Sequence, residues 1–206
     1  MRQTATAVVV VDPAAPDATA LARAAAVLRD GGLVAFPTET FYALGAAAGD
    51  PAAVRRVYAV KRRSESKPLL VLVESIAMAE SLAAEVTPRA RELMLRHWPG
   101  PLTLVLGARP DLPPVLTGAT GTIGVRMSPH PVARGVVRAL GAPVTAPSAN
   151  PEGGAPPTSA AQVLEAFGGA IDLVVDGGPT AGGPASTVVD VTTGTVRVLR
   201  AGAVAL

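Results

Sequence analysis

Apolar residues along this chain follow two spacings, and each spacing predicts one kind of element. Short continuous apolar runs bounded by glycine, proline or polar residues are typical of buried strands. Apolar residues that recur every three or four positions after a capping residue are typical of amphipathic helices. The expected strands span residues 33–36, 69–73, 102–106, 122–127, 143–145, 171–175, 186–191 and 195–199. The expected helices span residues 17–30, 50–61, 75–84, 87–98, 128–140 and 159–168.

The order of these elements predicts the fold class. Helices and strands alternate along most of the chain, which favours an α/β arrangement. The last two strands are adjacent and flank Thr193-Gly194, so we expect a hairpin there and therefore a mixed sheet. The 206 residues contain no internal repeat and no clear linker. One α/β domain over residues 1–206, with a twisted mixed parallel/antiparallel sheet and flanking helices, is the simplest interpretation.

Composition narrows the possible chemistry. The chain has no cysteine, which excludes disulfides, a thiolate nucleophile and zinc–thiolate sites. Its two histidines, His97 and His130, are too few for a His-based centre, so we expect no metal site built from protein ligands. The net charge of +2 permits RNA contact without demanding it. With only six aromatic residues, ring stacking along a nucleic-acid strand is not an obvious theme.

Signals for secretion and membrane insertion are weak. The first sixteen residues hold a short apolar run at 7–11 but no cleavage-site pattern, so we expect no signal peptide. No apolar stretch approaches the ~20 residues that a membrane-spanning helix needs. We therefore expect a cytoplasmic protein with no membrane partner.

Both lysines of the chain, Lys61 and Lys67, fall within one seven-residue stretch that also holds Arg62 and Arg63. Lysine acts as a compact point charge, whereas arginine grips planar oxyanions with two parallel bonds. Such a cluster beside the apolar run 69–73 suits a phosphate-rich ligand. The alternative is a solvated basic helix end, which is what many charge runs are.

Three further polar clusters stand at strand ends, where open α/β sheets place ligands. They are Pro37–Tyr42, the face shared by Thr122, Gly124 and Arg126, and the loop Ala146–Asn150. Each has a structural alternative: a turn closed by hydroxyls, a surface ion pair, or a plain loop. Neither a Walker P-loop nor a dinucleotide fingerprint is present, and no G-x-S-x-G motif suggests a hydrolase.

Taken together and in order, these clusters resemble the YrdC superfamily, and specifically the threonylcarbamoyl-AMP synthases. The resemblance covers residues 17–202, and several motifs in register are far more specific than any one of them. The matching segments are Pro37–Tyr42, Lys61–Arg63, Lys67–Leu69, Trp98–Thr103, Thr122–Arg126, Pro147–Asn150 and Ser186–Asp190.

The resemblance implies a YrdC-like fold with a concave basic groove, and a nucleotidyltransferase activity. Members of the family join L-threonine, bicarbonate and ATP to give threonylcarbamoyl-AMP and pyrophosphate, for threonylcarbamoyl-adenosine modification of tRNA. ATP is then a substrate, and Mg²⁺ is expected with it. No protein nucleophile is needed, because the enzyme supplies alignment and charge neutralisation.

The resemblance also implies roles for individual residues. Lys61 and Arg63 would carry catalysis by holding the triphosphate. The residues implied to bind ATP are Lys61, Arg63, Lys67, Thr122, Ser148, Asn150 and Arg200. Those implied to bind threonine are Thr40, Arg126 and Ser186, with Arg126 the natural partner of the carboxylate.

Other residues carry weaker expectations. Glu39 lies in the segment Pro37–Tyr42 and is the one acidic residue in the matching segments before the lysines. It would orient the lysine cluster, help to hold a metal, or form a structural ion pair. His97 and Trp98 are expected to pack, and His130 to stand at a solvent-facing helix start rather than to act as a base.

The chain departs from the usual family pattern at Ala43 and Arg62, where glycine is common, and at Pro156, where serine is common. A paralogue with the same fold and a different acceptor therefore stays open, as does a non-catalytic double-stranded-RNA or ribosome-binding module. By resemblance, a separate tRNA-modifying transferase complex would be a transient partner, with direct RNA contact possible. The chain stops soon after Arg200-Ala201-Gly202, so we expect the short form without an additional C-terminal domain.

Overall fold

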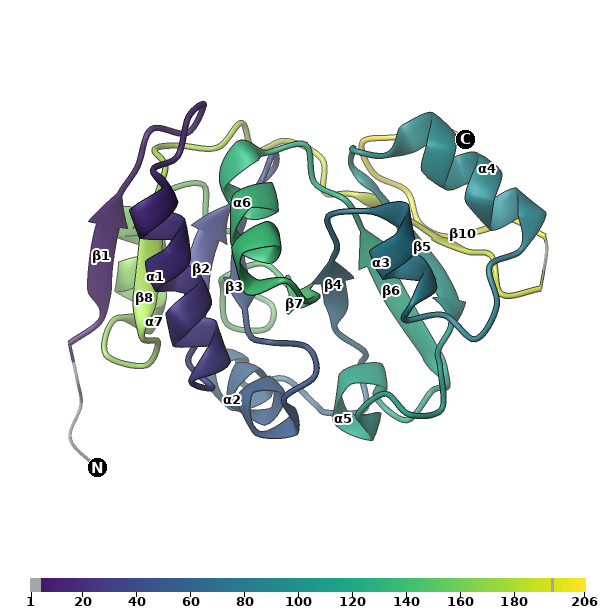
Figure 1. The fold of residues 1–206 in the computed structure, drawn as a ribbon, viewed down its shortest axis with the longest axis horizontal. Helices are drawn as coiled ribbons and strands as arrows, with labels where there is room; N and C mark the ends of the chain where they lie inside the picture. The colour runs from purple at the N-terminus through teal and green to yellow at the C-terminus, as the bar shows by residue number, and fades with distance from the viewer. Residues whose placement is uncertain (1–4, 194) are drawn as a thin grey trace.

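A computed structural model describes residues 5–193 and 195–206 and arranges them as helices around mixed sheets (Figure 1). The strands are β1 (Ala7–Val10), β2 (Val34–Pro37), β3 (Tyr42–Gly45), β4 (Leu70–Leu72), β5 (Leu102–Gly107), β6 (Thr122–Arg126), β7 (Val144–Thr145), β8 (Leu173–Asp176), β9 (Thr187–Asp190) and β10 (Arg197–Arg200). The helices are α1 (Ala18–Arg29), α2 (Pro51–Lys61), α3 (Ile76–Glu80), α4 (Pro88–His97), α5 (Pro114–Thr117), α6 (Pro131–Leu140) and α7 (Ala160–Phe167).

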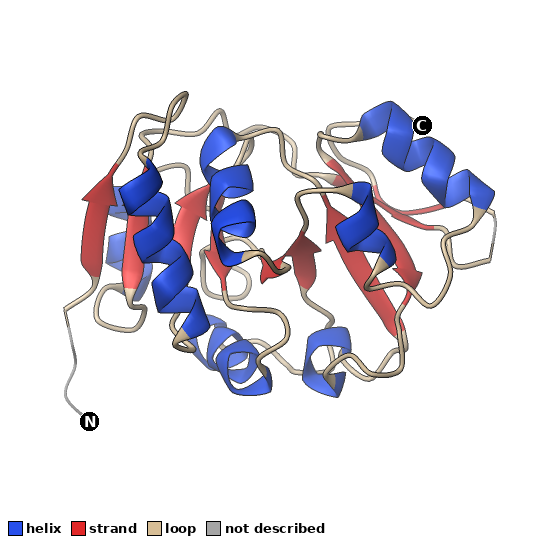
Figure 2. Ribbon diagram, viewed as in Figure 1, coloured by secondary structure: helices blue, strands red, loops and turns tan. Residues whose placement is uncertain are grey.

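The strands form two sheets with both parallel and antiparallel neighbours, which confirms the predicted mixed α/β class. A four-stranded sheet has the order β1-β8-β2-β3, and a six-stranded sheet has the order β10-β9-β5-β6-β4-β7. Figure 2 shows the two groups of strands side by side, with helices against them. The expected hairpin is confirmed by the antiparallel pairing of β9 with β10. Gly194 of its turn lies outside the described residues.

The two sheets meet where β3 runs beside the segment that follows β7. Leu44 donates its backbone N–H to the Pro147 carbonyl at 2.8 Å, and Ala149 donates to the Tyr42 carbonyl at 2.8 Å. An isolated bridge pairs Ala43 with Ser148. The predicted Pro-Ser-Ala-Asn loop therefore lies at the junction of the sheets.

Alternating side chains of the four-stranded sheet supply two cores. On β8, Leu173 and Val175 pack in a cluster with α1 and α6, whereas Val174 belongs to the cluster that contains residues of α7. Figure 1 shows α1 and α6 lying together over one face of this sheet. Both faces are thus covered, as parallel neighbours require.

Capping residues fix helix α2, which carries the first predicted phosphate-binding lysine. The Asp50 side chain accepts from the N–H groups of Ala52 and Ala53, and Pro51 occupies N1, as the sequence predicts. Arg62 ends the helix in the left-handed region at φ 53° and ψ 42°. This cap turns the chain sharply, so that Arg63 follows Lys61 toward the same side of the sheets.

The structure differs from the sequence-based elements in a few places. β1, β3 and the short α5 are additional, and α3 is shorter than the expected 75–84 helix. α6 begins at Pro131 rather than near residue 128, because the His130 ring caps it by accepting from the Val132 N–H at 3.2 Å. None of the helices in the described part of the chain has the length and apolar character to cross a membrane.

Candidate functional site

Two adjoining cavities lie where the sheets meet. The larger has a volume of about 600 Å³ and the smaller about 140 Å³. They share a wall built by residues from β4, β10 and the loop after β7. The shared residues are Leu70, Ser148, Pro156 and Arg200.

The large cavity gathers six of the seven residues that the resemblance implied for ATP, although they come from distant parts of the chain. These are Lys61, Arg63, Thr122, Ser148, Asn150 and Arg200. Lys67 does not line the cavity, but it forms an ion pair with Glu152, which does line it. The strand alternation that placed Thr122 and Gly124 on one face is confirmed by their shared position in this wall.

Lys61 is buried at the end of α2, with only 3% of its surface exposed. Its Nζ donates to the carbonyls of Ser148 and Asn150, both at 2.5 Å, and so ties α2 to the loop at the sheet junction. Burial, and then the neighbouring charge of Arg63, lower the pKa of Lys61 to about 8, with Glu152 opposing the shift. A lysine held in this way presents its charge in a fixed place.

Glu152 forms an ion cluster with the basic stretch. Its Oε1 contacts Lys67 Nζ at 2.5 Å and lies 3.8 Å from Arg63 Nη1. Arg63 also donates to the Pro68 carbonyl at 3.3 Å, while its buried Nε has no partner in the described residues. Lys61 and Arg63 of the basic stretch therefore line the cavity, whereas Arg62 and Lys67 are exposed to solvent.

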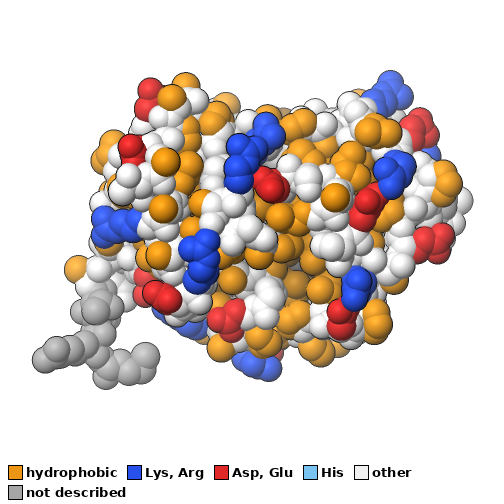
Figure 3. Space-filling model, viewed as in Figure 1, with side chains coloured by type: hydrophobic (Ala, Val, Ile, Leu, Met, Phe, Trp, Pro, Cys, Tyr) orange, Lys and Arg blue, Asp and Glu red, His pale blue; other side chains and the backbone are white. Residues whose placement is uncertain are grey.

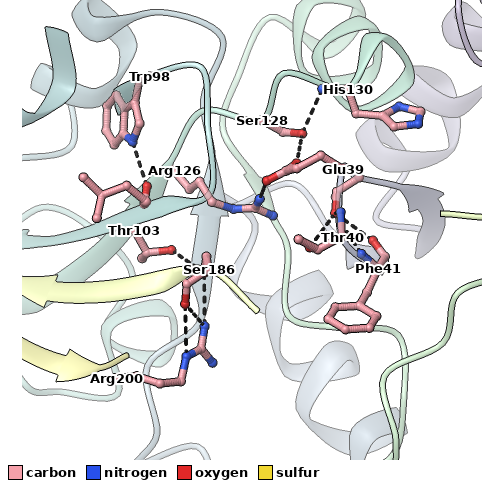
Figure 4. Close-up of polar contacts among 12 residues, drawn as sticks. Glu39, Thr40, Phe41, Trp98, Thr103, Arg126, Ser128, His130, Ser186 and Arg200 are labelled. Carbon is pink, nitrogen blue, oxygen red and sulfur yellow. Dashed lines mark hydrogen bonds and ion pairs between the residues drawn. The ribbon is translucent and has the colours of Figure 1, made fainter. Parts of the chain in front are cut away.

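The small cavity brings together all three residues that were implied for threonine. They are Thr40, Arg126 and Ser186. Figure 4 shows Arg126 reaching toward Glu39 and Thr40, with Ser186 and Arg200 close by. Arg126 is 4% exposed and pairs through Nη1 with Glu39, while its buried Nε has no partner among the described residues. Burial lowers the pKa of Arg126, and the Glu39 charge opposes that shift.

Hydrogen bonds fix the rest of the small cavity. Ser186 Oγ lies 2.9 Å from Thr103 Oγ1, and Arg200 Nη2 donates to the Ser186 carbonyl at 2.7 Å (Figure 4). Thr38 Oγ1 donates to the Phe41 carbonyl at 2.7 Å and closes the turn that presents Thr40. Thr38 thus closes the turn that was the structural alternative for Pro37–Tyr42, and both Thr38 and Thr40 line the small cavity.

Glu39 forms the structural ion pair that was one of its three interpretations. Its second oxygen accepts from Ser128 Oγ at 2.5 Å, and Ser128 Oγ in turn accepts from the His130 N–H at 3.2 Å. It does not contact the lysines. Among residues 5–193 and 195–206, no three His, Cys, Asp or Glu side chains come together as a metal site.

Trp98 and His130 line neither cavity and make structural contacts. Trp98 is buried and donates its indole N–H to the Leu102 carbonyl at 2.7 Å, which confirms its packing role. His130 caps α6 as expected, but it is partly buried rather than solvent-facing, and burial lowers its pKa.

The sequence and the fold of this chain are similar to those of known proteins. The Sua5/YciO/YrdC family model, described as "Telomere recombination", matches residues 26–202. The chain belongs to this family.

Several of its curated relatives are named threonylcarbamoyl-AMP synthase. A Pyrococcus abyssi protein named threonylcarbamoyl-AMP synthase is 45% identical over 183 residues, which are 89% of this chain and 54% of that protein. One from Thiobacillus denitrificans with the same name is 38% identical over 176 residues, 85% of this chain and 92% of that protein. The solved structure of P. abyssi Sua5 complexed with L-threonine superimposes with a TM-score of 0.92 at 42% identity, covering 96% of this chain and 58% of that one. The chain thus spans about half the length of the first curated relatives that it matches.

The three departures from the family pattern have distinct structural settings. Ala43 lies in β3 and lines the small cavity, and it is not among the described non-glycine residues with positive φ, so its methyl group narrows the cavity without backbone strain. Arg62 does adopt a positive φ of 53°, where glycine is easier. Pro156 lines both cavities and offers no hydroxyl to either.

Sequence reasoning did not find Glu152 or the Thr103 hydroxyl. Glu152 lies two residues after the Ser-Ala-Asn motif, and an acid so close to a motif implied to bind ATP was the available signal. Thr103 lies on β5 beside β9, and only their parallel pairing brings it to Ser186.

Proposed function

We propose that this chain makes L-threonylcarbamoyl-AMP from L-threonine, bicarbonate and ATP, with release of pyrophosphate, for threonylcarbamoyl-adenosine modification of tRNA. The observation that carries the proposal is the pair of adjoining cavities: a small one with a buried arginine opens beside a large one with a buried lysine. The names of the relatives and the L-threonine complex of P. abyssi Sua5 support it.

The large cavity suits the nucleotide. Its volume of about 600 Å³ lies within the range of small-molecule sites. Lys61 and Arg63 would neutralise the pyrophosphate as it leaves, with Lys67 at the edge. Thr122, Ser148, Asn150 and Arg200 would seat the rest of the nucleotide, since each lines the same wall.

The small cavity suits the amino acid. A volume of about 140 Å³ excludes a nucleotide and admits a small amino acid. Arg126 would bind the carboxylate through its free Nε side, while Glu39 holds the other side of the guanidinium in place. Thr40 and Ser186 would position the amine and the hydroxyl of threonine.

The proposed reaction needs alignment rather than a protein nucleophile. The neutral amine of threonine attacks the carbon of bicarbonate, and loss of water leaves a carbamate. A carbamate oxygen then attacks the α-phosphorus as the bond to pyrophosphate breaks. With threonine in the small cavity and ATP in the large one, the shared wall would hold them next to each other, which is the condition for this sequence of steps.

Mg²⁺ belongs to the proposal in a limited way. Mg²⁺ is commonly held by substrate phosphates together with one or two carboxylates. The lining of the large cavity offers one carboxylate, Glu152, which is already paired with Lys67. The residues therefore fit a metal that arrives on the phosphates, where it would neutralise their charge.

The remaining parts of the proposal concern partners and location. A separate transferase complex would consume the adenylate in the cytoplasm, through transient contact. On the face drawn in Figure 3, basic and acidic side chains are interspersed. This face therefore lacks the concentrated basic surface that double-stranded-RNA modules present.

The experiment that tests the proposal measures pyrophosphate release from ATP, with L-threonine and bicarbonate omitted in turn. We expect release only when both are present, and ¹³C from labelled bicarbonate in an AMP adduct identified by mass spectrometry. Folded protein that binds ATP without turnover would favour a paralogue with another acceptor. Folded protein that binds RNA and not ATP would support the binding module instead.

A further inference from the structure

The carboxylate of Glu152 occupies the place between basic side chains that a phosphate group would take. It contacts Lys67 Nζ and faces Arg63 Nη1 at 3.8 Å, and it is 29% exposed in the wall of the large cavity. Its hydrogen bond with Lys67 lowers the pKa of Glu152, so the group is charged at neutral pH. The protein thus supplies its own anion to its basic stretch.

The backbone around Glu152 is held independently of this side chain. The Glu152 N–H donates to the Lys61 carbonyl at 2.8 Å, and Asn150 Nδ2 donates to the carbonyls of Pro151 at 2.9 Å and Gly154 at 2.7 Å. Gly153 adopts φ +81° and completes the turn. The carboxylate is therefore able to leave its partners by side-chain rotation while the turn stays in place.

The contacts of Glu152 are weaker than those of a phosphate would be. Its distance to Arg63 exceeds that of a hydrogen bond, and the buried Arg63 Nε has no partner in the described residues. A phosphate carries more charge and more acceptor oxygens than a carboxylate. A pyrophosphate group would therefore displace Glu152 from these cations.

We propose that Glu152 is a displaceable counter-anion that sets the affinity of the site for pyrophosphate-bearing ligands. The inference rests on the proposed function, in which Arg63 and Lys67 hold the triphosphate. ATP binding moves the carboxylate aside, and the carboxylate returns to Lys67 as pyrophosphate leaves. Glu152 thereby weakens the retention of pyrophosphate. AMP, which lacks the β- and γ-phosphates, does not require the displacement.

Calorimetric titration of inorganic pyrophosphate into the whole chain tests this role. We expect Glu152→Gln to bind pyrophosphate roughly two- to fivefold more tightly than the wild type, the range that one exposed ion pair supports. The difference should shrink at high salt, because exposed charges are screened. AMP affinity should not change.

Two further variants make the result decisive. Glu165→Gln removes the same charge from an exposed position on α7, outside both cavities, and should leave pyrophosphate affinity unchanged. Glu152→Ala should tighten binding in the same direction as Glu152→Gln. Unchanged pyrophosphate affinity in both folded Glu152 variants would overturn the proposal. Weaker binding that appears only with Mg²⁺ would also overturn it and make Glu152 a metal ligand.

A synthase assay on the wild type separates this inference from the proposed function. If turnover requires threonine and bicarbonate but the Glu152 variants bind pyrophosphate as the wild type does, the counter-anion role alone is wrong. Tighter pyrophosphate binding by the variants without any wild-type turnover would uphold that role and sink the synthase.

Discussion

At the scale of single residues, Lys61 links structure and chemistry. It is the basic residue of the large cavity that is almost fully buried, and it holds two backbone carbonyls of the junction loop. Burial of a lysine is unfavourable unless its charge is paired or hydrogen-bonded. These carbonyls use two of its three N–H donors, and in the proposed function the negative charge of the ATP phosphates would complete its pairing.

Replacing Lys61 tests this role. Lys61→Met keeps most of the side-chain volume and should reduce the rate of adenylate formation about 100-fold or more, as loss of a charge-stabilising donor does. Arg55→Ala removes a positive charge from an exposed position on the same helix and should leave the rate unchanged. Steady-state pyrophosphate release measures both. A folded Lys61→Met protein with full turnover would contradict the phosphate assignment.

The lowered pKa of Lys61 predicts a pH dependence. Above a pKa of about 8 the folded protein loses the Lys61 proton, whereas the unfolded chain keeps it up to the ordinary value of 10.5. kcat/KM for ATP should therefore fall as pH rises through about 8, because the uncharged amine no longer attracts phosphate. Stability changes in the other direction: the buried charge opposes folding below about pH 8, and this penalty is relieved as pH rises from about 8 to 10.5, where the unfolded state binds more protons than the folded state. A pH–rate profile without an alkaline limb would contradict the assignment.

At the scale of elements, the end of α2 explains how the basic stretch is presented. Asp50 caps the start of the helix, and Arg62 ends it in a left-handed conformation that a residue with a Cβ adopts at some cost. The conformation is required because the chain must reverse to bring Arg63 beside Lys61. The left-handed cap thus lowers the stability of the helix end somewhat, while it places Lys61 and Arg63 at the cavity.

A glycine at this position should relieve the strain. Arg62→Gly is expected to stabilise the protein by about 0.5–1 kcal/mol, the left-handed penalty less the larger backbone entropy of glycine. Arg55→Gly, in the helix interior, should instead destabilise it by about 1 kcal/mol. Urea unfolding compares the two variants. A loss of stability in Arg62→Gly would show that the Arg62 side chain makes a contact worth more than the strain.

Local signals were sufficient for α2 and insufficient for β3. The dipeptide Asp50-Pro51 predicts the helix start from the sequence alone, and the structure confirms it. Tyr42–Gly45 is buried at every position and follows a polar turn, so it shows neither alternation nor a clear boundary. The junction of the two sheets likewise depends on pairings between residues about 100 apart, such as Ala43 with Ser148. Such pairings leave no local pattern, and for the same reason the contact of Glu152 with Lys67 was not predicted.

At the scale of the whole molecule, the junction of the two sheets creates the site. The motifs are spread over most of the chain, and folding brings them to two cavities with a common wall. The residue set was predictable because the motifs match a known family in order. Its grouping into a nucleotide set and a threonine set was implied by the same resemblance, but the common wall of the two cavities was not, since it depends on where the sheets meet.

The shared wall predicts coupled effects on both substrates. Arg200→Met should raise KM for ATP and for threonine about tenfold each, because Arg200 lines both cavities and holds Ser186. Arg126→Gln should raise KM for threonine alone, since Arg126 lines only the small cavity. Initial-rate kinetics with each substrate varied in turn measures both variants, with circular dichroism as the control for folding. An Arg200→Met effect confined to one substrate would argue against a common wall.

The most direct test of the account is a crystal structure of the protein grown with L-threonine and ATP. We expect the threonine carboxylate to bind Arg126 in the small cavity, and the ATP phosphates to contact Lys61 and Arg63 in the large one. Threonine bound elsewhere, or phosphates directed away from Lys61, would contradict it.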